Sequence, residues 1–266
     1  MSSSRLDLAL VERGLASSRT KAQRLIIRGV ITVNGGVIDK PSRLVETDDH
    51  IVCHEPDRDV GRGASKLRAA IERWGLPVDG AHCVDLGAST GGFTQVLLEA
   101  GAAAVVAIDV GHDQLHPTLR DDPRVFSWEG QSVLELTREL WEAKGLPTDV
   151  RVVVADLSFV SVGAVAKPIA SLFGVHTHYV LLVKPQFEVG RGKTTRGVVR
   201  DERLREQALR DVVDAWRDAG VPARDVICSP ITGEKGNVEY LLYASATSSV
   251  HPAEWDGHIP HIDEEG

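Results

Sequence analysis

Four nearly continuous apolar runs, separated by helix-like stretches, constrain this 266-residue chain more than any other feature. A strand with one solvated face alternates apolar and polar residues, whereas these runs are apolar on both faces. Such strands, alternating with helices, are typical of a mostly parallel sheet covered by helices on both sides. The predicted strands are HCVDLGA (82–88), AAVVAIDV (103–110), RVVVADLS (151–158) and YVLLVKP (179–185), with helices such as FTQVLLEAG (93–101) between them.

The C-terminal end of this α/β region has a different pattern. VICSPI (226–231) and NVEYLLYA (237–244) predict two closing strands, which we expect to run antiparallel at the sheet edge. Residues 247–266 show no periodicity and predict a flexible tail. The α/β domain is therefore expected to span residues 63–246.

A smaller α+β domain is predicted over residues 1–54. Its first helix covers 4–14, with Ser4 as the N-cap and Gly14 at the C-terminal end. A second helix follows Ser17 or Ser18 and ends at Gly29. VITVNGGVID (30–39) and RLVETDDHIVC (43–53) predict strands, with a tight turn at residues 34–36. The polar residues 55–62 predict a linker between the two domains.

Charge is distributed unevenly between these domains. The whole chain has a formal net charge of −8, but residues 1–45 hold eight Lys and Arg residues against three acids. A basic segment on an acidic chain indicates a local anion-binding surface. Lys21, Arg24 and Arg28 share one side of the second helix, where they form either a stripe that follows a phosphate backbone or a solvated helix face.

A glycine-rich turn follows the first strand of the α/β region. Glycines at this point let the backbone approach a ligand closely, at the edge where such sheets bind cofactors. The sequence has no Lys after the glycines and no GxGxxG, so it matches neither a phosphate-binding P-loop nor a dinucleotide fingerprint. Asp109, at the end of the next strand, is placed to accept hydrogen bonds from ribose hydroxyls. The candidate cofactor-binding residues are Asp85, Gly87, Ala88, Ser89, Thr90, Gly91, Gly92, Phe93, Asp109 and Asp156.

Three charged residues occupy positions where a core strand normally has none. Asp156 and Lys184 end two apolar runs, and Glu239 lies inside a third. Buried charges are rare unless they are paired, and the carboxyl ends of parallel strands are where such folds assemble their sites. Lys66, taken alone, would be interpreted as a surface lysine of a helix.

The N-terminal motifs resemble the S4 RNA-binding domain. The resemblance covers residues 5–53 and rests on Arg-Leu-Asp at 5–7, Ser-Arg at 18–19, Arg-Gly-Val at 28–30 and Val-Asn-Gly at 33–35. It implies an RNA partner. The residues expected to bind RNA in this domain are Arg5, Arg19, Lys21, Arg24, Arg28 and Lys40.

The glycine-rich turn with Asp109 resembles the S-adenosylmethionine site of class I (Rossmann-like) methyltransferases. Lys66, Asp156, Lys184 and Glu239 resemble the Lys-Asp-Lys-Glu tetrad of FtsJ-like 2′-O-ribose methyltransferases. Together with DLGASTGGFT, DLSFVS, LVKPQFEVG and NVEYLLY behind an S4-like domain, they resemble the TlyA family. This resemblance implies methylation of cytidine riboses in ribosomal RNA, with S-adenosylmethionine as the cofactor and ribosomal subunits as partners.

The resemblance also implies a role for each charged residue. Lys184 is expected to remove the proton of the ribose 2′-hydroxyl, with Lys66 as a second cation near it. Asp156 and Glu239 would orient the lysines and the hydroxyl, and Asp156 would also face the cofactor. This chemistry requires no metal. Two residues of the basic loop after the Lys184 strand, Arg191 and Lys193, either contact the RNA backbone or lie on a solvated loop.

Other classes of function are weighed against this one. The chain has no apolar run long enough to span a membrane, its N-terminal residues predict no secretory signal, and its three scattered cysteines lead us to expect a reducing cytoplasm. A monomer without a membrane or metal partner is the working expectation. The alternatives are an RNA-binding or ribosome-binding protein with a degenerate methyltransferase fold, or a hemolysin-type activity.

Overall fold

A computed structural model describes residues 3–16, 18–54, 59–190 and 192–247. Their contacts divide the chain into two units, residues 1–59 and residues 60–266. Each unit has its own buried hydrophobic cluster, so each is described by itself.

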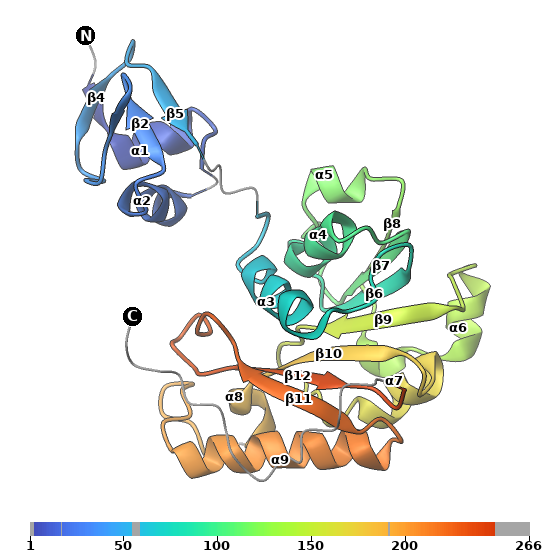
Figure 1. Ribbon diagram of the computed structural model, residues 1–266. Coiled ribbons are helices and arrows are strands. Elements are labelled where there is room, and N and C mark those ends of the chain that lie inside the picture. The colour runs from blue at the N-terminus through green and yellow to red at the C-terminus, as the bar shows by residue number, and fades with distance from the viewer. Residues whose placement is uncertain (1–2, 17, 55–58, 191, 248–266) are drawn as a thin grey trace. The chain divides into compact units, whose positions relative to one another are not determined.

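A seven-stranded sheet forms the larger unit, in the order β11-β12-β10-β9-β6-β7-β8 (Figure 1). The four strands predicted from apolar runs are confirmed, and neighbouring members of this set pair in parallel. One further parallel strand escaped prediction, because its VFSWE sequence is only partly buried. These five strands are β6 (His82–Leu86), β7 (Ala104–Asp109), β8 (Val125–Glu129), β9 (Val150–Ala155) and β10 (His178–Val183).

The closing strands correct one expectation. β12 (Tyr240–Ala244) is antiparallel to both of its neighbours, but it lies inside the sheet rather than at its edge. The edge is formed by β11 (Ala223–Cys228). Burial explains this order: every residue of β12 is buried, whereas every residue of β11 is half-buried. The more apolar strand therefore takes the interior position.

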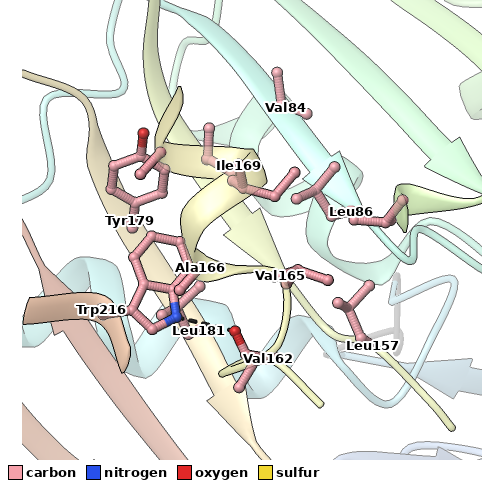
Figure 2. Close-up of a cluster of buried hydrophobic side chains, with 14 of the residues drawn as sticks. Val84, Leu86, Leu157, Val162, Val165, Ala166, Ile169, Tyr179, Leu181 and Trp216 are labelled. Atoms are coloured by element: carbon pink, nitrogen blue, oxygen red, sulfur yellow. Dashed lines mark hydrogen bonds between the residues drawn. The ribbon is translucent and has the colours of Figure 1, made fainter. Parts of the chain in front are cut away.

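Helices cover both faces of this sheet, as predicted. Alternate side chains of β6 point to opposite faces, so Cys83 packs with α3, α4 and α5 while Val84 and Leu86 pack with α6, α7 and α9. Figure 2 shows the second of these clusters, in which the buried Trp216 ring donates a hydrogen bond to the Val162 carbonyl at 3.0 Å. The helices are α3 (Ala64–Trp74), α4 (Gly92–Glu99), α5 (Pro117–Arg120), α6 (Arg138–Ala143), α7 (Ala166–Phe173), α8 (Pro185–Glu188) and α9 (Glu202–Asp218), with a 3₁₀ turn at Val133–Glu135.

The smaller unit packs two helices against short strands. Ser18 caps α2 by accepting a hydrogen bond from the Lys21 N–H, as predicted. The tight turn is also confirmed, since Asn34 and Gly35 both have positive φ. The elements are β1 (Ser3–Arg5), α1 (Leu6–Glu12), α2 (Arg19–Ile27), β2 (Ile31–Val33), β3 (Gly36–Val37), β4 (Leu44–Glu46) and β5 (Ile51–Cys53).

Three details of this region differ from prediction. Ser4 lies in β1 and pairs with Val45, so it does not cap α1. Residues 43–53 form two strands rather than one, because β4 pairs with β1 and β5 pairs with β2. The predicted linker is too long at its C-terminal end, since the Val60 N–H donates to Gln95 within the larger unit. Residues 55–58 and most of the predicted tail, 248–266, lie outside the described residues.

Candidate active site

The glycine-rich turn between β6 and α4, residues 87–91, forms a cradle. Two of its positions accept only glycine. Gly87 has φ +83°, and a Cβ there would lie 2.6 Å from the Asp156 carbonyl oxygen. Gly91 has φ +95°, and its Cβ would overlap the Leu119 side chain. These two glycines therefore let the turn pack against the end of β9 on one side and α5 on the other.

Asp109, at the end of β7, connects the glycine-rich turn to the loop that follows β7. Its carboxylate accepts hydrogen bonds from the Ser89 N–H at 2.8 Å and from the Gly111 N–H at 2.7 Å. A carboxylate accepts about four hydrogen bonds, so these two leave capacity for ribose hydroxyls. The side chain is half-buried, which keeps it accessible from the cradle edge.

Asp85 lies inside β6, two residues before Gly87, and is fully buried. One carboxylate oxygen, Oδ2, accepts a hydrogen bond from the Thr94 hydroxyl at 2.7 Å. The other, Oδ1, has no hydrogen-bond partner among the described residues. Burial raises the pKa of Asp85 to about 7, and the nearby Asp156 and Asp109 carboxylates add to this effect. An unpaired buried oxygen beside a glycine cradle fits a site that receives a polar ligand.

The charged residues meet where the carboxyl ends of β9 and β10 lie beside the start of β12. Asp156 directly follows β9 and Lys184 directly follows β10. Glu239 directly precedes β12 rather than lying inside a strand, which corrects the sequence-based expectation. Because β12 runs antiparallel and pairs Tyr240 with Val183, its first residue lies at the same edge as the last residues of β9 and β10.

Two ion pairs form at this end of the strands, one buried and one in which the acid is half-buried. Lys184 Nζ lies 2.6 Å from Asp156 Oδ1, and Lys66 Nζ lies 2.7 Å from Glu239 Oε2. Lys66 is 7% exposed although it lies on α3, so the interpretation as a surface lysine is wrong. A Cβ on Gly63 would lie 3.6 Å from Asp156 Oδ2, which places the start of α3 beside the Lys184 pair. The structure thus brings all four predicted tetrad residues into one site.

Two loops hold Glu239 in place. A Cβ on Gly233 would overlap Glu239 Oε1, so the loop before β12 packs directly on this carboxylate. Asn237 accepts a hydrogen bond from the Val199 N–H at 3.0 Å and donates one to the Gly197 carbonyl at 2.8 Å. Asn237 therefore fastens the basic loop after α8 next to Glu239.

Sequence reasoning missed two residues beside Lys184. Its Nζ donates a hydrogen bond to the Ser158 hydroxyl at 3.0 Å and lies 5.8 Å from the centre of the Phe187 ring. Phe159, the residue after Ser158, has φ +65° and is 89% exposed, with its ring 5.2 Å from that of Phe187. The DLSFVS motif contains this aromatic residue, but exposure and positive φ are visible only in the structure.

The residues predicted to bind RNA differ in their surroundings. Arg24, Arg28 and Lys40 are exposed in the smaller unit, as is Lys193 in the larger unit. Lys21 is half-buried and donates a hydrogen bond to the Asp59 carbonyl. Arg5 and Arg19 both contact Asp7. Arg191 lies outside the described residues.

The described part of the chain contains no cluster of three His, Cys, Asp or Glu side chains arranged to hold a metal ion. Over the same residues, no helix combines the length and the apolar character needed to cross a membrane.

Comparisons with known proteins agree with this two-part architecture. A family model for FtsJ-like methyltransferases matches residues 60–246, and one for the S4 domain matches residues 4–51. The chain is 43% identical over 242 residues to the 16S/23S rRNA (cytidine-2′-O)-methyltransferase TlyA of Mycobacterium tuberculosis, covering 90% of this chain and 88% of that one.

Two further relatives carry a different name. Hemolysin A of Brachyspira hyodysenteriae is 38% identical over 240 residues, which cover 90% of this chain and 98% of that one. A solved structure from Streptococcus thermophilus, whose name assigns it provisionally to the hemolysins, matches with a TM-score of 0.68 at 34% identity. That match covers 96% of this chain and 92% of the other.

Proposed function

The chain belongs to the FtsJ-like methyltransferases and, among them, to the TlyA family, and we propose on this premise that it methylates the 2′-hydroxyl of cytidine in ribosomal RNA. The observation that carries the proposal is the pair of Lys–carboxylate contacts beside the glycine-rich turn, in both of which the lysine is buried. Two separate structural explanations would be needed if these paired charges, of which Lys66, Lys184 and Glu239 are buried, had no chemical role. Their pairing at one sheet edge also argues against a degenerate site in a protein that only binds RNA.

The cofactor we propose is S-adenosylmethionine, which when bound supplies an electrophilic methyl group on a sulfonium. One observation supports a fit: Asp85 keeps a buried oxygen without a hydrogen-bond partner among the described residues, next to the turn that Gly87 and Gly91 allow to pack against the end of β9 and α5. We assign Asp109 to the ribose hydroxyls of the cofactor and Asp156 to the side of the sulfonium. The remaining contacts are assigned to the turn, namely Gly87, Ala88, Ser89, Thr90, Gly91, Gly92 and Phe93.

Lys184 is assigned the part of general base. A ribose 2′-hydroxyl is a very weak acid, so its proton must leave as the oxygen attacks. Lys184 accepts this proton as a neutral amine, after its ammonium form has released one proton to water. Asp156 and Ser158 fix the position of Lys184 Nζ with contacts of 2.6 and 3.0 Å. The Lys66–Glu239 pair orients the ribose and supplies a second cation in the same site. Positioning of this kind accounts for much of the acceleration in transfer reactions.

Phe159 is assigned to the target base. The Phe159 ring is 89% exposed and its backbone has φ +65°, a strained conformation of the kind that clusters at functional sites, and this supports a ligand contact. Aromatic side chains stack on nucleobases that have been taken out of a helix. Because Phe159 is next to Ser158, a base stacked on it would bring its ribose toward Lys184.

The smaller unit is assigned the delivery of RNA. Its cations Arg19, Arg24, Arg28 and Lys40 are exposed and suit phosphate contacts, as does the half-buried Arg5, whose side chain is 38% exposed; Lys21, whose amine contacts the Asp59 carbonyl, is a weaker candidate. Lys193 is assigned to RNA beside the active site, because Asn237 fastens its loop next to Glu239. An rRNA substrate also places the activity in the cytoplasm, with the ribosomes.

Transfer of label from tritiated S-adenosylmethionine to ribosomal subunits that lack the modification tests this proposal. Wild-type protein is expected to label the rRNA, and nuclease digestion should recover the label as 2′-O-methylcytidine. Lys184→Ala is expected to transfer at least about 100-fold more slowly. Lys167→Ala, at an exposed lysine of α7, is the matched control and should transfer normally.

Label on another nucleoside would refute the assigned acceptor. An active Lys184→Ala variant would refute the assigned base. Cofactor binding without transfer to either subunit would favour a protein that only binds RNA. The name hemolysin A describes the Brachyspira relative, and the proposal for this chain rests on the paired charges beside the glycine-rich turn.

A further inference from the structure

An aspartate is buried inside the most basic part of the chain. Asp7 lies in the first turn of α1 and has no exposed surface, although residues 1–45 carry an excess of Lys and Arg. A site that selects only for positive charge would not retain a buried carboxylate, because the acid cancels part of the attraction for phosphate. The contacts of Asp7 give a different reason for its presence.

Four hydrogen bonds converge on the Asp7 carboxylate from three side chains. Arg5 binds it in a bidentate manner, with Nε 3.0 Å from Oδ1 and Nη2 2.8 Å from Oδ2. Arg19 Nε donates to Oδ2 at 3.0 Å, and Gln23 Nε2 donates to the same oxygen at 2.9 Å. These hydrogen bonds, chiefly those from Arg5, hold the pKa of Asp7 far below its usual range, so the carboxylate stays ionised.

The two arginines keep part of their donor capacity for an outside ligand. The Arg5 side chain is 38% exposed and the Arg19 side chain is 53% exposed. Arg19 contacts Asp7 through Nε alone, and no acceptor among the described residues engages its two terminal nitrogens. A guanidinium fixed at Nε presents its terminal N–H groups in a defined plane, which matches the two-point geometry of a phosphate.

Arg13 of the same unit shows the contrasting arrangement. Its guanidinium donates to the backbone carbonyls of Glu46, Thr47 and Asp49, at 2.6–3.1 Å, and thereby closes the turn between β4 and β5. All of its observed hydrogen bonds serve the fold. Arg5 and Arg19 instead share one carboxylate and leave donors toward solvent, which is the arrangement expected of a binding surface.

We propose that Asp7 is a positioning residue for RNA binding, which fixes the guanidinium groups of Arg5 and Arg19 for contact with two RNA phosphates. The inference rests on the proposed function, since it requires that the smaller unit binds RNA. It makes a prediction of unusual sign: removing this negative charge weakens the binding of a polyanion.

Asp7→Asn tests that sign in the full-length protein. The variant keeps the size of the side chain but loses its charge, so it releases the two arginines from their fixed orientation. We expect its affinity for purified 30S or 50S subunits at 0.15 M salt to fall about tenfold, and the magnitude of the salt slope to fall by about 1–2, one unit for each lost phosphate contact. Asp39→Asn, which removes an exposed acid of the same unit, is the matched control and should bind at least as tightly as wild type.

A double-mutant cycle separates positioning from a general effect on folding. In an Arg5→Ala, Arg19→Ala background, Asp7→Asn is expected to change RNA affinity less than twofold, because the groups it acts through are gone. Thermal unfolding of each variant is followed alongside. Arg19→Lys is a second probe, since a lysine keeps the charge but cannot present a fixed fork, and it should lose affinity as Arg19→Ala does.

The outcomes distinguish a failure of the Asp7 inference from a failure of RNA binding by the smaller unit. If wild type binds subunits and Asp7→Asn binds equally or more tightly, charge alone governs the surface and the inference is wrong. An equal loss in the Arg5→Ala, Arg19→Ala background would make Asp7 a structural residue and also overturn it. If wild-type protein itself shows no salt-dependent binding, the RNA-delivery role of the smaller unit fails, and this inference fails with it.

Discussion

Both units of this protein bury an aspartate completely, and the two aspartates behave in opposite ways. Asp7, in the smaller unit, meets two guanidinium groups that hold its pKa below the usual range. Asp85, in the larger unit, meets one hydroxyl and a buried strand, and burial raises its pKa to about 7. Burial alone therefore does not set the charge of a carboxyl group; its partners do.

The paired cations of the two units differ in how far their side chains are exposed. Arg5 and Arg19 pair with a buried acid but keep 38% and 53% of their side chains exposed. Lys66 and Lys184 also pair with acids, yet their side chains are only 9% and 11% exposed. The same type of ion pair thus suits a binding surface when the cation faces water, and a reaction site when it does not.

The largest expected effect on methyl transfer alone, without an effect on RNA binding, comes from the buried pair Lys66–Glu239. Lys66→Ala should lower the rate of methyl transfer about 10²–10⁴-fold, while RNA affinity stays within about twofold, because the pair acts on the reaction and not on delivery. Single-turnover transfer and subunit binding measure the two quantities. Glu239→Ala should have a similar effect, and the double variant should cost little more than either single one.

A surface ion pair between α3, the helix of Lys66, and α4 provides the control. Arg68 Nη2 lies 2.6 Å from Glu99 Oε2, but both side chains are more than 40% exposed. Arg68→Ala should leave transfer unchanged and alter stability by less than about 1 kcal/mol, because exposed pairs contribute little. Equal losses from Lys66→Ala and Arg68→Ala would show that burial does not distinguish the two pairs.

The next effect concerns the pH dependence of stability. A carboxyl whose pKa rises from 3.8 in the unfolded chain to about 7 in the folded one binds more protons when folded. The unfolding free energy of the larger unit should therefore fall as pH rises from about 4 to about 7, by up to about 4 kcal/mol from Asp85. Asp85→Asn should flatten this decline, since Asn cannot ionise.

Denaturant unfolding followed by tryptophan fluorescence measures this difference. All five tryptophans lie between residues 74 and 255, so the signal reports on the larger unit alone. The quantity of interest is wild type minus Asp85→Asn at each pH, which removes the contribution of other titrating groups. A difference that stays constant from pH 4 to pH 7 would mean that Asp85 is ionised throughout and has a partner beyond Thr94.

The smallest expected effect compares two glycines. Gly233→Ala places a methyl group against Glu239 Oε1 and should lower methyl transfer about tenfold by displacing that carboxylate. Gly36→Ala, in the smaller unit, meets only the Val33 carbonyl at 3.6 Å, an ordinary contact, and should leave both RNA binding and stability nearly unchanged. Normal transfer by Gly233→Ala would show that the loop before β12 adjusts freely and does not hold Glu239.

The elements that sequence reasoning located share a strong local signal. The apolar runs of β6, β7, β9 and β10 are nearly continuous, and Asn34-Gly35 provides the positive φ values that a tight turn requires. Where the signal was weak, the prediction failed. β8 reads VFSWE and is half exposed, and Ser4 resembles a helix cap although its backbone is drawn into pairing with β4.

The sequence by itself determined which residues of this protein are chemically unusual: a glycine turn after a buried strand, and charges at the ends of apolar runs. Only the tertiary structure decided which of them meet. Glu239 reaches Lys66 because β12 is reversed and inserted beside β10, and Lys66 is buried because α3 packs over that edge. The physical reason is that burial and periodicity act along neighbouring residues, whereas the pairing of charges 173 positions apart depends on strand order.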